Sequence, residues 1–409
     1  MTSAKSSPSR RPPTSGTPVA GPIVLALSMI LVAFNMRPAL SSLGPVLPEV
    51  MRDDRLSAAG ASLLTTLPVT FLGVFGLAAP WLGRRLGYDR TVAALTAVLA
   101  AGLALRLQGG VAALFASAAL AGIGIGVVNV LMPGLVKRDF PSRTAFMVGV
   151  YTMSMTSGAA LAAGTVVPLT ALLGGSWAAA LGTWAVPALL AALVWALRLP
   201  RAGDSGAAPM RVLGLWRNRL AWQVTIYMGF QSALFYCIIS WLAPMLRDRG
   251  MSPEAAGLTV SISVITQAAV VLLVPSLAAR SRDQRLVATL CILLAQVGFL
   301  GLLYAPLGTA WLWTLVLGVG QGSAFGVALT VIVLRAHDAR TAAALSGMAQ
   351  GVGYIIASGG PLLTGLLRSG PGGWNAVAVM FVVVGAVAVV SGRGAGRALQ
   401  IGGPEHPPS

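Results

Sequence analysis

The residue best suited to bind a charged ligand is Arg37, which stands in the run Asn35-Met36-Arg37-Pro38 about midway along an apolar stretch. A cation near the centre of a bilayer costs about 3 kcal/mol on insertion scales, so Arg37 must face a partner or an aqueous cavity. The eleven Asp and Glu residues all fall in connectors, tails or the ends of apolar stretches. Glu49 is about 18 Å away at 1.5 Å per helical residue. The sequence therefore supplies no evident acidic partner.

An unpaired guanidinium can hold an anion at two points with its planar fork. The sequence thus predicts an anion site at Arg37. The alternative is a structural role, in which Arg37 bonds backbone carbonyls that Pro38 leaves free where it breaks the helix. No Asp, Glu or His lies inside an apolar stretch as a proton relay, because His337 is in a connector and His406 is near the end of the chain.

Further polar and aromatic side chains inside apolar stretches are predicted to complete the binding cavity: Asn129, Tyr151, Gln231, Tyr236, Gln350 and Tyr354. Gln350 and Tyr354 are four residues apart and share a helix face. Gln267 and Gln321, in two other stretches, are further candidates for the cavity lining. Each of these side chains has an alternative role as an interhelical hydrogen bond or, for the aromatics, an interfacial anchor.

The runs Gly122-x-Gly124-x-Gly126 and Gly318-x-Gly320-x-Gly322 are interpreted as helix-packing surfaces. They are not dinucleotide loops, because no strand precedes them. The two cysteines, Cys237 and Cys291, lie in apolar stretches and have no metal-ligand spacing. No nucleophile motif joins the Ser, His and Asp residues. We therefore expect no cofactor, no metal and no catalytic residues, and the protein is not predicted to be an enzyme.

The elements that must position Arg37 are membrane helices. The chain is 56% hydrophobic and only 10% charged, whereas soluble proteins carry about 25% charged residues. A span needs about 20 mostly apolar residues. Twelve stretches meet that measure, at roughly 22–48, 57–82, 91–108, 111–136, 144–173, 177–198, 220–246, 255–279, 286–305, 310–334, 341–367 and 374–391. The predicted fold is an all-α integral membrane protein with twelve transmembrane helices.

The twelve stretches divide into two repeated sets of six. The two Gly-x-Gly-x-Gly runs are offset by 196 residues, and Arg143-Thr144 matches Arg340-Thr341 at an offset of 197. Parallel repeats of this kind are typical of one class of secondary transporter. We expect two pseudo-symmetric six-helix bundles, 21–198 and 220–392, joined by a polar linker at 199–219. The segments 1–20 and 393–409 are predicted to be tails.

The net charge of +17 is a topology signal, because the basic residues lie between the apolar stretches. Of the 28 Lys and Arg residues, 21 fall on the side of the N-terminus and six on the opposite side. This bias predicts a multi-pass protein of the cytoplasmic membrane with both termini cytoplasmic. Nucleic-acid binding is not expected.

Several stretches carry a family resemblance. They are Asn35-Met36-Arg37-Pro38-Ala39-Leu40-Ser41-Ser42-Leu43-Gly44-Pro45, Met228-Gly229-Phe230-Gln231-Ser232-Ala233-Leu234-Phe235-Tyr236, Trp241-Leu242-Ala243-Pro244 and Asp248-Arg249-Gly250-Met251-Ser252-Pro253. With them the chain resembles the major facilitator superfamily from about residue 20 to 395, and within it the cyanate porter family of cyanate and 2-nitroimidazole transporters. The resemblance implies the major facilitator fold, a central cavity, alternating access and a monomeric carrier.

The gating loop of that superfamily corresponds here to Trp81-Leu82-Gly83-Arg84-Arg85-Leu86-Gly87-Tyr88-Asp89-Arg90. Its candidate functional residues are Arg84, Arg85, Asp89 and Arg90. The sequence departs from the family pattern, because Arg84 stands where the family has Asp. Asp89 is the candidate substitute for the missing acid.

The leading hypothesis is a transporter that moves a small anion, cyanate-like or a small carboxylate, through the lipid bilayer. Its predicted partners are that small-molecule substrate and the lipid. The alternative is an exporter of small neutral or weakly basic drugs such as nitroimidazoles, with little dependence on Arg37. A membrane sensor would need a signalling domain, and none is evident in the tails.

Overall fold

The computed structural model describes residues 21–197, 214–280 and 283–401. Within these ranges eleven segments are helical, long enough and apolar enough to cross a membrane. The other predicted span, 341–367, coincides with α14 (Ala339–Arg368), a helix rich in Gly, Ser and Thr that packs against both α4 and α10. The prediction of an all-α membrane fold is confirmed. The predicted tail 1–20, residues 199–213 of the predicted linker and residues 402–409 lie outside the described ranges.

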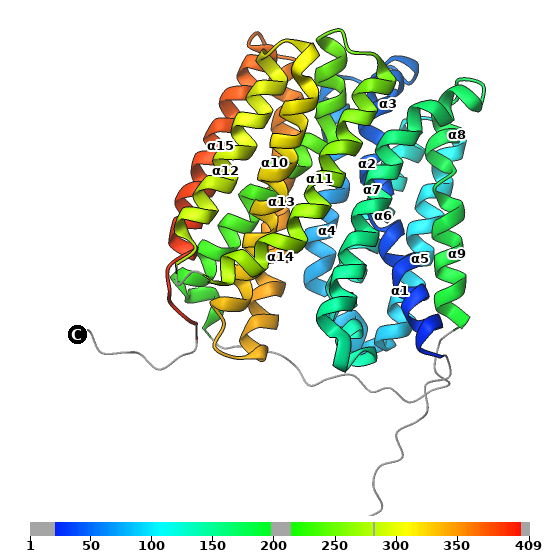
Figure 1. Ribbon diagram of the computed structural model, residues 1–409. Helices are drawn as coiled ribbons and strands as arrows, with labels where there is room; N and C mark the ends of the chain where they lie inside the picture. The colour runs from blue at the N-terminus through cyan, green and yellow to red at the C-terminus, as the bar shows by residue number, and fades with distance from the viewer. Residues whose placement is uncertain (1–20, 198–213, 281–282, 402–409) are drawn as a thin grey trace, which may run out of the picture.

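The first half of the chain contributes α1 (Pro22–Asn35), α2 (Pro38–Ser41), α3 (Leu43–Asp53), α4 (Ala58–Leu86), α5 (Tyr88–Leu105), α6 (Val111–Asp139), α7 (Thr144–Leu172), α8 (Trp177–Gly182) and α9 (Ala185–Leu197). The second half contributes α10 (Arg219–Asp248), α11 (Pro253–Arg280), α12 (Arg285–Tyr304), α13 (Ala310–Leu334), α14 and α15 (Gly373–Ala395). Figure 1 shows the two halves side by side.

The two ends of the molecule are named here after α1 and α3. The α1 end is where α1 begins and α15 ends, at the lower edge of Figure 1. The α3 end is the opposite one, where Asp53 ends α3 and Asp248 ends α10. The predicted first span is divided into α1, α2 and α3 rather than continuous. Proline explains the first break, because Pro38 has no N–H to continue the hydrogen-bond ladder of α1.

The glycine runs build equivalent contacts in both halves. A Cβ on Gly122 would lie 2.5 Å from the carbonyl oxygen of Pro68 in α4, and one on Gly318 would lie 2.7 Å from that of Ser263 in α11. The middle glycines of the two runs are also equivalent, because Gly124 lies against α5 and Gly320 lies against α12. Only glycine permits such close helix contact. The interpretation of these runs as packing surfaces is consistent with both sets of contacts.

The halves meet along three helix pairs, α3 with α10, α4 with α14, and α7 with α11. At the α3 end, Arg247 of α10 forms an ion pair with Glu49 of α3 at 2.7 Å. Nearby, the Ser261 hydroxyl of α11 donates to the carbonyl oxygen of Ala160 in α7 at 2.8 Å. These contacts close the interface between the halves at that end.

Candidate functional site

The break after α1 positions Arg37. Residue 37 is the N-cap of α2, and its carbonyl oxygen accepts from the backbone N–H groups of Leu40 and Ser41. Its side chain leaves the first half and reaches α10 of the second half. Arg37 Nη1 is 3.5 Å from the Tyr236 hydroxyl, and Arg37 Cζ is 5.2 Å from the centre of the Phe235 ring. Among the described residues, no carboxylate forms an ion pair with Arg37.

Aromatic side chains surround this guanidinium. The Tyr236 ring packs edge-on against Tyr354 of α14, with 6.1 Å between ring centres, and Arg37 Cζ is 5.9 Å from the Tyr236 ring centre. On the first half, the Tyr151 hydroxyl donates to Asn129 Oδ1 at 3.1 Å and contacts Met36 Sδ at 3.4 Å. Arg37 therefore sits among ring faces and hydroxyl groups, an environment that favours a cation without neutralising it.

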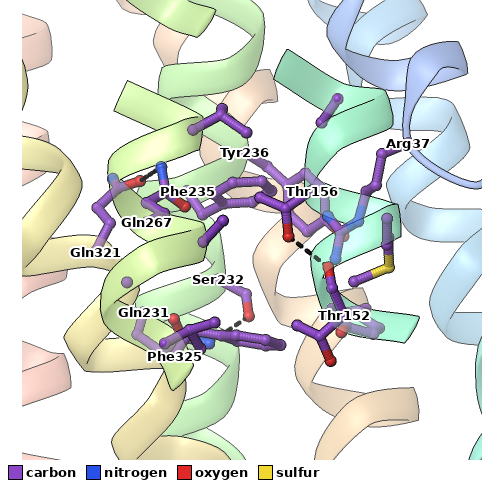
Figure 2. Close-up of a pocket in the computed structure, with 17 residues that line it drawn as sticks. Arg37, Thr152, Thr156, Gln231, Ser232, Phe235, Tyr236, Gln267, Gln321 and Phe325 are labelled. Atoms are coloured by element: carbon purple, nitrogen blue, oxygen red, sulfur yellow. Dashed lines mark hydrogen bonds between the residues drawn. The ribbon is translucent and has the colours of Figure 1, made fainter. Parts of the chain in front are cut away.

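A cavity of about 600 Å³, which includes space open to solvent, lies between the halves beside Arg37. We call it the Arg37 cavity. Its lining comes from both halves: Arg37, Thr152, Met155, Thr156 and Ala159 on one side, and Gln231, Ser232, Phe235, Tyr236, Val264, Gln267, Ala268, Val271, Gln321, Gly322, Phe325 and Tyr354 on the other. In Figure 2, Arg37 and the two threonines face the glutamines and phenylalanines across this space.

The structure brings most of the predicted site residues together. Arg37, Gln231, Tyr236 and Tyr354 line the cavity. Asn129 and Tyr151 are not among its lining residues but form the hydrogen-bonded pair next to Met36 and Arg37. Gln350 is the exception, because its Nε2 donates to Ser346 Oγ at 2.8 Å and it does not line the cavity. Sharing a helix face with Tyr354 did not bring Gln350 to the same space.

Two further candidates from the sequence, Gln267 and Gln321, also line the cavity. They face each other, with 3.4 Å from Gln267 Nε2 to Gln321 Oε1. Gln321 Nε2 is buried and has no hydrogen-bond partner among the described residues. Because Gln321 lines the cavity, this unpaired donor lies within the cavity wall. The sequence signal for both residues was their polarity within apolar stretches. Thr152 and Thr156, four residues apart on α7, carried the same kind of signal.

The predicted gating residues lie at the α1 end. Asp89 begins the first turn of α5, is buried, and accepts from Arg138 of α6 at 2.6 and 3.2 Å. Arg85 stacks on Trp81, and Arg84 and Arg90 are exposed. The pair of Asp89 with Arg138 lies within one half. The second half repeats it with a neutral acceptor, since Arg335, 197 positions after Arg138, bonds Gln284 and the carbonyl oxygen of Ala395.

The arrangement suits reversible binding rather than chemical conversion. The cavity combines one uncompensated cation, neutral amides and hydroxyls, and aromatic walls. No cluster of three or more His, Cys, Asp or Glu side chains is placed to hold a metal in the described part of the chain. A binding site between two pseudo-symmetric helical bundles, near the middle of the membrane-spanning helices, defines a secondary transporter.

Comparison with known proteins agrees with this class. Residues 25–358 match the family model described as Major Facilitator Superfamily, and the chain belongs to that superfamily. It is 38% identical over 386 residues to the 2-nitroimidazole transporter of Escherichia coli (strain K12), covering 93% of this chain and 97% of the relative. It is 33% identical over 350 residues to the cyanate transport protein CynX of the same organism, covering 84% and 90% of the two chains. The predicted resemblance to these transporters is confirmed.

A solved structure shows the same fold. The crystal structure of a mutant of the nucleoside transporter NupG matches with a TM-score of 0.73 at 15% identity, covering 91% of this chain and 99% of that one.

Proposed function

We propose that the protein is a secondary active transporter that moves a small anion, cyanate-like or a small carboxylate, across the cytoplasmic membrane by alternating access. The observation that carries this proposal is the position of Arg37. Its guanidinium lines a cavity between the halves and has no carboxylate partner among the described residues. An anion would supply the missing charge, and the fork geometry of arginine suits two-point binding of planar anions.

The other cavity groups support a small substrate with oxygen or nitrogen acceptors. Gln321 Nε2 offers a free donor at the wall. The hydroxyl of Tyr236 stands beside the guanidinium. An anion bound by Arg37 would replace the long 3.5 Å contact to the neutral Tyr236 hydroxyl with a shorter hydrogen bond between opposite charges.

We further propose that the α1 end faces the cytoplasm. The excess of Lys and Arg on the side of the N-terminus supports this orientation. The state described here would then be closed toward the outside by the contacts at the α3 end.

A second candidate function is export of small neutral or weakly basic aromatic compounds. Two observations favour it: the relative named as a 2-nitroimidazole transporter, and the Phe235 and Phe325 rings in the cavity wall next to the amides of Gln267 and Gln321. A flat heteroaromatic ring stacks on such walls. In this case Arg37 would be dispensable for binding.

Thermal stabilisation of the purified protein separates the two functions. We expect cyanate or acetate at one hundred times its Kd to stabilise the wild type by about 2.7 kcal/mol and to leave Arg37→Gln unchanged. Arg217→Gln, which removes an exposed arginine, is the matched control and should respond like the wild type. If a nitroimidazole alone stabilises the protein, and does so equally in Arg37→Gln, the anion proposal is wrong and the exporter is supported.

A further inference from the structure

Another arginine, Arg106, is buried and lines a cavity between the halves. It lies where α5 ends, at the start of the short turn Arg106–Gln108, and only 3% of its surface is exposed. Its Nε donates to Ser117 Oγ at 2.8 Å, its Nη2 to the carbonyl oxygen of Ala39 at 2.7 Å, and its Nη1 to Ser42 Oγ at 3.3 Å. Arg106, rather than Arg37, thus bonds the broken first span.

All three acceptors of Arg106 are neutral. Within the described ranges no carboxylate pairs with it. A guanidinium has five N–H donors, so two remain beyond these three bonds. An uncompensated buried charge is costly, and a neutral glutamine could anchor a carbonyl and a hydroxyl group without that cost. A buried guanidinium with spare N–H donors beside a cavity is suited to receive an anion.

Arg106 lines a narrow cavity on the α3 side of Tyr236, which we call the Arg106 cavity. Its polar lining is Arg106, Thr65, Tyr236 and Ser240, and the remainder is apolar: Ala39, Leu40, Leu43, Leu64, Pro68, Val69, Leu114, Ala118 and Ile239. Tyr236 lines both this cavity and the Arg37 cavity. Helix α10 passes both cavities. Gln231 and Phe235, which precede Tyr236 in the chain, line the Arg37 cavity, and Ile239 and Ser240, which follow it, line the Arg106 cavity.

We propose that the Arg106 cavity is a second binding site for the transported anion, on the route between the Arg37 cavity and the α3 end, with Tyr236 as the partition between the two. This inference rests on the proposed function. The cavity is narrow here because the halves are in contact at the α3 end, and it widens when they separate there. The anion then passes from one fixed cation to the next instead of crossing an apolar stretch alone.

The test places a carboxylate in the Arg106 cavity. Ser240 is buried and lines that cavity, and Ser240→Asp would neutralise Arg106, whereas Ser240→Asn has the same size without the charge. The probe is radiolabelled cyanate or acetate, whichever stabilises the wild type, with uptake into proteoliposomes and thermal stabilisation as the two readouts. We expect Ser240→Asp to slow uptake by about tenfold or more relative to Ser240→Asn. Anion binding at the Arg37 cavity should change far less than uptake in both variants, because Ser240 lines the Arg106 cavity and not the Arg37 cavity.

Three outcomes would overturn the inference. The first is equal uptake by the two Ser240 variants, whether high or low. The second is loss of anion binding in Ser240→Asp in parallel with uptake, since the carboxylate would then act on Arg37. The third is uptake at the wild-type rate by Arg106→Gln, once a melting curve has shown that this variant is folded. Failure of the proposed function is distinct from all three, because the wild type would then bind no anion or Arg37→Gln would bind it normally.

Discussion

Glu49 of α3 and Arg247 of α10 join the two halves of the molecule through a two-pronged ion pair. Arg247 Nη1 donates to Glu49 Oε2 and Arg247 Nη2 lies beside Oε1, each at 2.7 Å, while Nη1 also donates to the carbonyl oxygen of Pro45 at 3.0 Å. Both side chains are about one-fifth exposed. In the proposed alternating-access mechanism, the pair forms only while the α3 end is closed, so it would bias the equilibrium between the two access states.

Glu49→Gln is expected to shift that equilibrium toward opening at the α3 end. A partly exposed ion pair contributes about 1 kcal/mol, which corresponds to roughly a fivefold change in population. The measurement is the alkylation rate of Leu43→Cys, a residue of the Arg106 cavity, in protein whose Cys237 and Cys291 are replaced by serine.

Asp248→Asn is the matched control, because Asp248 pairs with Arg368 and Trp374 within the second half at the same end. It should leave the alkylation rate unchanged. Equal acceleration by both variants would mean that general loosening, not the link between the halves, controls access.

Gly44→Ala should open the same end by steric means. A Cβ at position 44 would lie 2.6 Å from the carbonyl oxygen of Ile239 on α10, a backbone atom that cannot move aside alone. We expect faster alkylation of Leu43→Cys than in the parent protein. Gly134→Ala is the control, because nothing lies within 4 Å of a Cβ there, and alanine should stabilise that helix by up to about 1 kcal/mol. Unchanged access in Gly44→Ala would show that α3 and α10 are not in contact during transport.

Hydrophobic stretch length and glycine spacing were sufficient to predict the membrane helices and their repeat. The break at Pro38 was expected from the proline, but the second break, between Ser41 and Leu43, was not, because apolar periodicity continues through it while the backbone ladder does not. Arg37 was found because an isolated charge in an apolar stretch has few explanations. Arg106 was missed because it stands near the end of the predicted span 91–108 and was counted only as a topology signal, whereas its long side chain reaches back to Ala39 and Ser42. The direction that a side chain takes is set by tertiary packing. The Gln350 amide, for the same reason, points toward Ser346.

The buried Asp89 carboxylate should make Arg138 important for stability. Arg138→Gln would leave that carboxylate without its bidentate partner, and the cost should be about 1–2 kcal/mol, below the range for fully buried pairs, because Arg138 is 41% exposed. Arg90→Gln removes a neighbouring exposed arginine and should be neutral. The measurement is the melting temperature of the purified variants in detergent. A normal melting temperature for Arg138→Gln would show that the Asp89 charge is compensated by its other contacts.

Gln321→Leu should weaken ligand recognition with a small loss of stability. The substitution removes the unpartnered donor Nε2, but it also removes Oε1, which accepts from Gln267 Nε2, so we expect a loss of stability of about 1 kcal/mol. If a bound substrate accepts a hydrogen bond from this group, the Kd should rise by about fivefold, as expected for loss of one hydrogen bond of about 1 kcal/mol. Gln350→Leu is the comparison, since that amide bonds Ser346 and lies outside the cavity. Binding of the same anion, measured by calorimetry on both variants, decides the matter: equal Kd values would mean that the substrate does not reach the α13 wall of the cavity.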